Sequence, residues 1–322
     1  MKKRINKFVT EMLCRIVRTC RSFPPEEHIL IFAEPRGGST WLAEIMSKLL
    51  RIPILWEPLH LRGVEHFKKA GLGWEQVIPE DAQWEEAKNA FEELLRGKVL
   101  NEWLCIASPP LRFLFAKRML IKFCRGNALL PWLTRMFRFK YAPIYLVRHP
   151  LAVVCSQLKH GAWDALPEKF VLPNNKYNDI YVENIDFLTG LKNKAEVLLA
   201  NWCIMNASTI TNPRNDKDWI TVHYEDLVLD PEFEMRRIFG RLGLPVPDSF
   251  VDLMSVPSRT AKDQPLLDNK RSQLEKWMYY FDQEQLDRFS MIMRHFKVEC
   301  YNVVSPVKAV NECSTGSGAP SL

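Results

Sequence analysis

The sequence of 322 residues lacks several patterns that would assign it to a broad class. Its eight cysteines are scattered, with no C-x-x-C pair and no Cys/His cluster at zinc spacing, which argues against a zinc module. No apolar run approaches the roughly 20 residues of a membrane-spanning helix. The N-terminus is basic but has no apolar signal-peptide core. We therefore expect free thiols and a cytoplasmic protein, with peripheral attachment to a membrane left open.

Apolar sequence is plentiful by contrast. Hydrophobic residues make up 47% of the chain and aromatic residues 11%, enough for a large core and too much for a disordered protein. The net charge of +6 suits an anionic ligand without selecting nucleic acid, nucleotide or membrane.

The first 27 residues predict a separate basic, amphipathic helix. Its apolar residues recur at helical spacing: Ile5, Phe8, Val9, Met12, Leu13, Ile16 and Val17. One interpretation is a helix packed on the main body. The other is a helix that touches a membrane surface through residues 1–22.

Apolar segments alternate with helical patterns along most of the chain. Strands are predicted at 28–33, 52–58, 119–124, 142–147 and 219–227, and helices at 39–50, 80–96, 149–159 and 231–243. This alternation predicts an α/β fold: one domain with a mostly parallel central sheet flanked by helices. We place this domain at 28–303, with a loop-rich insertion at 161–190 on the acceptor side and a flexible tail at 304–322.

The turn after the first predicted strand reads EPRGGST and has the composition of an anion cradle. Amides at a helix start have no partner within the helix, and the helix dipole adds positive charge there. Gly37 and Gly38 allow close backbone approach, Ser39 and Thr40 add hydroxyl donors, and Arg36 adds a cation. The alternative is an ordinary turn capped by a serine.

This turn is not a nucleoside-triphosphate loop of the G-x-x-x-x-G-K-[ST] kind, because the lysine and the longer glycine span are absent. No acidic strand end offers an obvious magnesium site, so we predict no metal. A P-loop-like kinase or hydrolase remains one alternative, and it requires magnesium and that lysine. A non-catalytic nucleotide- or membrane-binding protein is another, and it predicts affinity without turnover.

A second basic-plus-hydroxyl pattern follows the strand at 142–147. In IYLVRHPLAVVCSQL, Arg148 ends the strand and Ser156 lies two turns into the next helix. Such a pair can hold a second phosphate beside the first cradle. Taken alone, Arg148 is better explained as a surface or salt-bridge arginine.

The two segments together resemble the donor-binding motifs of sulfotransferases. PRGGSTWL is similar to the 5′-phosphosulfate loop of that family, and YLVRHPLAVVCS is similar to its 3′-phosphate motif. VHYEDL at 222–227 and SQLEKWMYYF at 272–281 resemble two later family elements in the same order. The loop begins with Arg36 rather than lysine, which is nearer the carbohydrate and tyrosylprotein branches than the small-phenol branch.

The resemblance implies a donor and the residues that hold it. The donor is 3′-phosphoadenosine 5′-phosphosulfate (PAPS), used as co-substrate without a metal. The implied donor-binding residues are Arg36, Gly37, Gly38, Ser39, Thr40, Trp41, Arg148, Ser156, Tyr224, Arg271 and Lys276. Two departures from the family pattern are Gly37, where relatives often carry a hydroxyl residue, and His149, where they carry Asp or Asn.

The resemblance also implies in-line transfer of a sulfuryl group to an acceptor hydroxyl, with stabilisation of the leaving oxygen by Arg36. Glu57, in IPILWEPLHL, is the predicted general base, and burial beside Trp56 is expected to raise its pKa. His60 is the alternative base. The acceptor is a glycan, a metabolite alcohol or a tyrosine, with carbohydrate or small-molecule alcohols favoured; no nucleic acid partner is expected.

Overall fold

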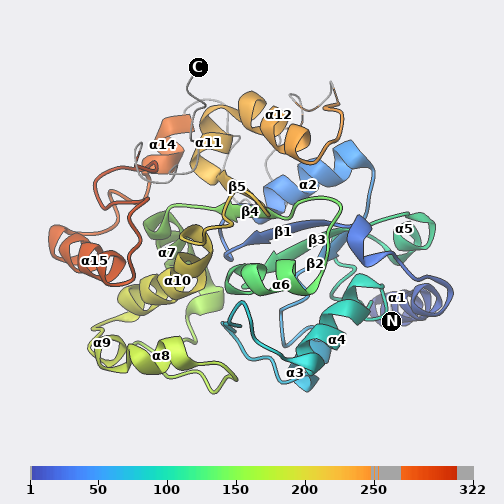
Figure 1. Ribbon diagram of the computed structural model, residues 1–322, viewed down its shortest axis with the longest axis horizontal. Helices are drawn as coiled ribbons and strands as arrows, with labels where there is room; N and C mark the ends of the chain where they lie inside the picture. Colours follow the sequence, from blue (N-terminus) through green and yellow to red (C-terminus); the bar gives the residue numbers. More distant parts are fainter. Residues whose placement is uncertain (1, 248–249, 251–252, 254–269, 310–322) are drawn as a thin grey trace.

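Five short strands lie side by side in the order β2-β3-β1-β4-β5, and each neighbouring pair is parallel. They are β1 (Ile29–Ala33), β2 (Ile54–Trp56), β3 (Leu120–Cys124), β4 (Ile144–Val147) and β5 (Ile220–His223). The structure is a computed structural model that describes residues 2–247, 250, 253 and 270–309. The chain is a single α/β domain with its parallel sheet at the centre, as the sequence predicts (Figure 1).

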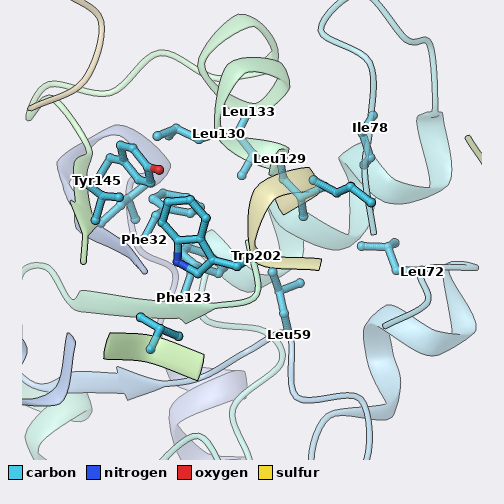
Figure 2. Packing of buried hydrophobic residues seen from close by; sticks show 14 of the residues in the cluster. Phe32, Leu59, Leu72, Ile78, Phe123, Leu129, Leu130, Leu133, Tyr145 and Trp202 are labelled. Carbon is cyan, nitrogen blue, oxygen red and sulfur yellow. The ribbon is translucent and has the colours of Figure 1, made fainter. Parts of the chain in front are cut away.

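Both faces of the sheet are buried, because alternate strand residues enter two separate cores. Ile29 and Ile31 belong to one core, whereas Leu30 and Phe32 belong to the other. Phe32 stacks on Phe123 of the neighbouring strand, with ring centroids 4.7 Å apart, at the centre of the second core (Figure 2). Strands covered on both faces read as continuous apolar runs, which is why the sequence pattern revealed them.

Helices form a layer on each face (Figure 1). The first core contains residues of α2 (Ser39–Leu50), α11 (Tyr224–Leu229), α12 (Pro231–Arg241) and α14 (Lys270–Glu275). The second contains residues of α1 (Lys2–Cys20), α4 (Glu85–Leu95), α6 (Leu130–Met136), α7 (Pro150–Leu158), α10 (Lys194–Ile210) and α15 (Gln283–His295). Shorter helices are α3 (Glu65–Lys69), α5 (Pro110–Phe115), α8 (Asp179–Glu183) and α9 (Ile185–Thr189). Among the described residues, no helix is both long and apolar enough to cross a bilayer.

The structure departs from the predicted elements in several places, and α15 (Gln283–His295), for example, was not predicted. The strand predicted at 219–227 ends at His223, and its last residues instead begin α11. The helix predicted at 80–96 begins at Glu85. The pattern also gave no sign of α10, because this helix is buried on nearly all sides and therefore has almost no polar stripe.

The segment 161–190 folds over the loop that follows α3. Gln76 donates to the Lys176 carbonyl at 2.5 Å, and the Tyr181 hydroxyl donates to the Glu75 carbonyl at 2.9 Å. Asn175 donates to the Trp74 carbonyl at 2.8 Å. These contacts join the segment to the same loop that leads away from Glu57 and His60.

Candidate functional site

The predicted site residues gather where the order of the strands reverses. From β1 the chain crosses over to β2 on one side of the sheet, whereas β4 and β5 lie on the other side. The carboxyl ends of β1 and β4 therefore diverge and leave a crevice between their loops. In open parallel sheets, ligands bind at this position.

The turn between β1 and α2 adopts a conformation that requires glycine. Gly38 has a φ of +92°, and a Cβ there would lie 2.5 Å from the Tyr224 ring. A Cβ on Gly37 would lie 2.8 Å from the Glu34 carbonyl oxygen, which already accepts from the Gly37 amide at 2.8 Å. The first amides of α2, beginning at Ser39, then remain as the free donors of a helix start.

Arg148 extends from the end of β4 to this turn. Its Nη1 donates to the Arg36 carbonyl at 3.0 Å, and its guanidinium lies 4.6 Å from the centre of the Tyr224 ring. Its Nε is buried and has no hydrogen-bond partner among the described residues. Trp41 contacts the same tyrosine edge-on, with ring centroids 6.2 Å apart. The glycine turn, Arg148 and Tyr224 therefore form one cluster.

Arg36 joins the two predicted phosphate sites. Its φ is +72°, and its Nε donates to the Ser156 hydroxyl on α7 at 3.0 Å. Sequence reasoning assigned these two side chains to different phosphates, yet they are in direct contact. Arg36 and Gly38, on either side of Gly37, both have positive φ values, so the backbone turns sharply at this point.

His149 caps α7, which explains how it can occupy an Asp or Asn position. Its Nδ1 accepts from the Leu151 amide at 3.2 Å, so in the neutral ring Nε2 carries the proton and donates to the Asn302 carbonyl at 2.9 Å. Burial lowers the pKa of His149 to about 3, which keeps the ring neutral. The ring stacks on Trp277, with centroids 4.4 Å apart.

Beneath this loop lies a buried network that fixes its backbone. The Glu225 carboxylate accepts from the His149 amide at 2.8 Å and from the Tyr301 hydroxyl at 3.1 Å. The same hydroxyl lies 2.8 Å from Nδ1 of His223. Burial raises the pKa of Glu225 to about 7.

Glu57 follows β2 with a φ of +39°, a strained value for a residue with a side chain. Its Oε1 lies 2.5 Å from Nζ of Lys122, a side chain only 1% exposed. Burial has the largest single effect and acts to raise the pKa of Glu57, but the charge and hydrogen bond of Lys122, the charge of Arg125 and the Cys124 thiol together lower the pKa below its ordinary value. The expected raised pKa is therefore wrong, because the partners of Glu57 oppose the effect of burial.

A thiol links Glu57 to the helix of the glycine turn. Burial raises the pKa of Cys124 to about 11, so the thiol keeps its proton and donates to Oε1 of Glu57 at 3.4 Å. The Ser39 hydroxyl lies 3.6 Å from the same sulfur. The predicted base and the predicted phosphate cradle are thus two contacts apart.

His60 lies among aromatic rings. It stacks on Trp103 at 4.1 Å between centroids and meets Trp74 edge-on at 5.4 Å. Burial lowers its pKa, and its Nδ1 accepts from the Gly63 amide at 3.2 Å. Trp103 also donates to the Glu57 carbonyl at 3.2 Å. His60 thus lies in an aromatic cluster beside Glu57.

The two cations predicted near the C-terminus lie at the surface. Arg271 pairs with Glu275 on the same helix at 3.2 Å, and Lys276 is exposed. It is the next residue, Trp277, that reaches the site, through its stacking on His149. The predicted segment therefore adjoins the Arg148 loop, but through an aromatic residue.

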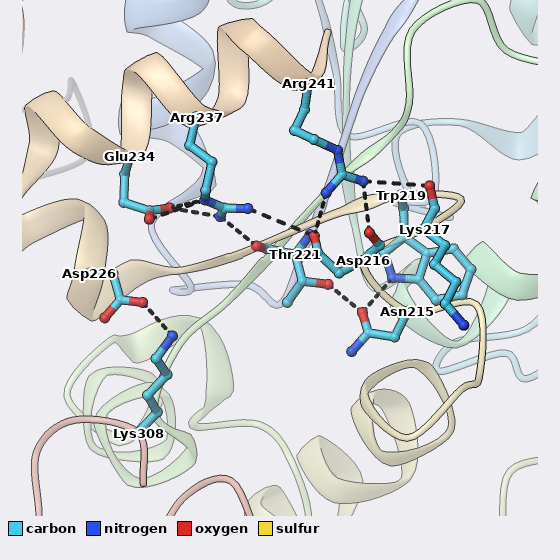
Figure 3. Close-up of polar contacts among 10 residues, drawn as sticks. All are labelled: Asn215, Asp216, Lys217, Trp219, Thr221, Asp226, Glu234, Arg237, Arg241 and Lys308. Atoms are coloured by element: carbon cyan, nitrogen blue, oxygen red, sulfur yellow. Dashed lines mark hydrogen bonds and ion pairs between the residues drawn. The ribbon is translucent and has the colours of Figure 1, made fainter. Parts of the chain in front are cut away.

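A cavity of about 520 Å³ lies elsewhere, beside β5. Its charged lining consists of Asp216, Asp226, Asp230, Glu234, Arg237 and Lys308. Lys308 pairs with Asp226 at 2.7 Å and Arg237 with Glu234 at 2.8 Å (Figure 3). Carboxylates outnumber cations here and both cations are paired, so this cavity disfavours an anionic ligand.

Comparison with known proteins gives one decisive match. The family model described as "Sulfotransferase family" matches residues 28–248, more than half of the chain. The chain belongs to the sulfotransferase family. This stretch contains the glycine turn, Glu57, Arg148 and Tyr224, so the family match covers the whole cluster described above.

Solved sulfotransferase structures cover most of this sequence at low identity. They include mouse sulfotransferase SULT7A1 complexed with PAP, at 17% identity over 89% of this chain and 90% of that chain, with a TM-score of 0.42. The sulfotransferase domain of the Synechococcus PCC 7002 olefin synthase has 19% identity over 86% and 96%, with a TM-score of 0.45. The sulfotransferase domain of the curacin biosynthetic pathway has 16% identity over 84% and 98%, with a TM-score of 0.46. No curated protein sequence matches significantly.

The sequence analysis of this sulfotransferase did not identify four residues that lie beside Glu57 or His60, namely Lys122, Cys124, Trp74 and Trp103. One signal was available for Lys122: it is the single charged residue in the apolar strand LIKFC, and a buried charge needs a partner. The two tryptophans carry no such signal, because they come from separate loops. Among the described residues, no group of three or more His, Cys, Asp or Glu side chains could hold a metal ion.

Proposed function

We propose that this sulfotransferase takes its sulfuryl group from PAPS and transfers it to a hydroxyl of an alcohol acceptor. The main support for this proposal is the environment of Arg148. Its Nε is buried without a partner among the described residues, beside a glycine turn that excludes any side chain and beside the Tyr224 ring. A buried, unpaired guanidinium nitrogen is costly unless a ligand satisfies it, and a phosphate oxygen is the acceptor that suits it.

The residues present fit both phosphates of such a donor. The amides at the start of α2 and the Arg36 guanidinium suit the 5′-phosphosulfate, and Arg148 with Ser156 suits the 3′-phosphate. Tyr224 offers an aromatic face near both. We further propose that Lys276, next to Trp277, and Arg271 approach the donor from the C-terminal segment.

PAPS supplies a sulfuryl group on a good leaving group. The acceptor oxygen forms the new bond to sulfur as the bond from sulfur to the bridging phosphate oxygen breaks. Glu57 takes the acceptor proton, and its lowered pKa keeps it ionised and ready at neutral pH. Arg36 stabilises the charge that develops on the bridging oxygen. Lys122 holds the Glu57 carboxylate in place.

The surroundings of Glu57 favour a carbohydrate or small alcohol as acceptor. His60, Trp74 and Trp103 form a rigid aromatic wall beside the base. Aromatic faces bind the apolar faces of sugar rings and similar alcohols at low entropic cost.

The donor site is tested by calorimetric titration with 3′-phosphoadenosine 5′-phosphate in buffer containing EDTA. Wild type is expected to bind, and Arg148→Ala to bind at least about tenfold more weakly, since charge-assisted hydrogen bonds contribute about 1.5–3 kcal/mol each. Arg236→Ala is the matched control, because that arginine is exposed on α12, where it pairs with Glu232 and lies over the Phe250 ring.

Turnover is tested separately with radiolabelled PAPS and a panel of sugars, alcohols and tyrosine peptides. Glu57→Gln is expected to bind the nucleotide normally and to lose at least about 100-fold in kcat. No nucleotide binding by folded wild type would refute the proposal. Binding of ADP only with magnesium would favour the kinase alternative instead.

A further inference from the structure

One part of the surface carries a group of exposed apolar side chains. On α1 and the segment 106–115, seven large apolar residues are exposed, from 39% for Ile16 to 81% for Phe115. They are Phe8, Val9, Met12, Ile16, Ile106, Leu111 and Phe115, and we refer to them as the α1–α5 face. An exposed apolar patch of this kind is typical of a surface that binds a protein, a membrane or a ligand.

The packing of α1 does not account for its exposed residues. Cys14 and Val17 are buried and attach the helix to the second core. Phe8, Met12 and Ile16 follow one another at four-residue spacing and therefore form a second stripe. This second stripe remains outside although the helix is already anchored.

Two contacts place the segment 106–115 against α1. The sulfur of Cys14 lies 3.6 Å from that of Cys105, the residue before Ile106. Arg21, just after α1, donates to the Ala116 carbonyl at 2.6 Å, the residue after Phe115. The helices α1 and α5 pack together at one side of the molecule (Figure 1). The apolar residues of both therefore form one surface.

Positive charges accompany this face. Lys7, Arg15 and Lys117 are exposed, and Arg15 lies seven residues, close to two full turns, after Phe8, on the same side of α1. The exposed acids of α1 and its surroundings, Glu11 and Glu102, pair with Arg18 and Lys7. Arg15 and Lys117 have no ion-pair partner among the described residues, and apolar side chains bordered by such cations match the boundary between acyl chains and anionic headgroups.

We propose that the α1–α5 face docks the protein on a membrane surface that carries anionic lipids. The apolar side chains enter the headgroup boundary, while Arg15 and Lys117 attract the lipid phosphates and carboxylates. The segment 106–115 enlarges this surface beyond α1, which the amphipathic pattern of α1 alone does not reveal. The proposal is independent of the donor and acceptor of the enzyme.

Co-sedimentation of the full chain with vesicles tests this proposal. Vesicles of phosphatidylcholine alone are compared with vesicles that contain about one third phosphatidylserine. Wild type is expected to bind the anionic vesicles and to lose binding as salt is raised. The double variant Phe8→Ser/Phe115→Ser is expected to bind at least about tenfold more weakly. Arg15→Gln and Lys117→Gln are each expected to weaken binding about fivefold, on anionic vesicles only.

The control is Phe233→Ser, because Phe233 is another exposed phenylalanine, at 61%, on the distant helix α12. It is expected to bind vesicles as wild type does, and circular dichroism checks that all variants fold. Failure of wild type to bind, or equal loss in the Phe233 variant, overturns the proposal. Self-association that Phe8→Ser/Phe115→Ser abolishes, without vesicle binding, assigns the face to a second copy of the chain and also overturns it.

Discussion

The ammonium of Lys122 lies 2.5 Å from Oε1 of Glu57 and 3.7 Å from the centre of the Trp56 ring. These residues come from adjacent parallel strands, with Trp56 paired in register with Lys122. The lysine therefore holds the carboxylate at the carboxyl end of the sheet, two contacts from the glycine turn. Because both charges are largely buried, removal of either leaves the other buried without its oppositely charged partner in direct contact.

Replacement of Lys122 by Met is expected to raise the pKa of Glu57, since the opposing charge is lost while the burial remains. If Glu57 is the general base, the acid limb of the pH profile of kcat/KM moves upward by at least about one pH unit. Lys140→Met is the control, because Lys140 forms an exposed pair with Glu27 at 2.9 Å. An unmoved acid limb in folded Lys122→Met would show that another group is the base.

A second prediction concerns Gly38→Ala. Its Cβ would lie 2.5 Å from the Tyr224 ring at a φ of +92°, so the turn and the ring must both shift. We expect nucleotide affinity to fall at least about tenfold and stability to fall by about 1–3 kcal/mol. Gly240→Ala on α12 is the control, because no atom of the described residues outside its own helix backbone lies within 4 Å of the added Cβ. It should stabilise the helix by about 0.5–1 kcal/mol. Equal nucleotide affinity of the Gly38→Ala and Gly240→Ala variants would contradict the proposal that the glycine turn binds the nucleotide.

His149 allows a comparison of two substitutions. Asn retains an oxygen that can accept from the Leu151 amide, whereas Ala does not. Both variants lose the stacking on Trp277 and the bond to Asn302. We therefore expect the free energy of unfolding, measured by urea denaturation, to decrease from wild type to His149→Asn to His149→Ala, with the Ala variant about 1 kcal/mol less stable than the Asn variant. We expect nucleotide affinity to decrease in the same order. Equal stability and equal nucleotide affinity of the Ala and Asn variants would show that the cap at His149 does not hold the neighbouring Arg148 in place.

Most of the sheet could be predicted from the sequence, because strands covered on both faces leave uninterrupted apolar runs. The helix 39–50 was predicted with the bounds that the structure shows. The pattern failed for α10, whose burial removes the polar stripe, and at 224–227, where apolar residues continue beyond the strand into α11. Periodicity reports which residues are buried, and it loses its meaning where an element is buried all round.

The site was predictable to the extent that it lies in continuous motifs. Arg36, Gly38 and Arg148 stand in two short segments, and the structure brings those segments together. The Glu57–Lys122 pair joins residues 65 positions apart, and local sequence gives no sign of their contact. The pKa of Glu57 was mispredicted for this reason, because burial could be guessed from neighbours but the opposing charge could not.

The last prediction concerns pH and stability. Burial raises the pKa of Glu225 from its ordinary value near 4.5 to about 7, so the folded protein holds a proton that the unfolded chain has already released. Stability must therefore fall as the pH rises from about 4.5 through 7, because the unfolded state binds fewer protons over this window. The Gln variant stays neutral throughout, and its amide can still meet the Tyr301 hydroxyl, with His223 changing tautomer.

Urea denaturation of wild type and Glu225→Gln at pH 5 and pH 8 measures this effect. The stability of wild type relative to the variant should decrease by about 3 kcal/mol between these pH values, since each pKa unit corresponds to about 1.4 kcal/mol. The burial of His149 and His223 is common to both proteins, so their titration largely cancels in the difference. A difference that is constant with pH would mean that Glu225 is ionised in the folded state, and that the His149 amide binds a full carboxylate charge.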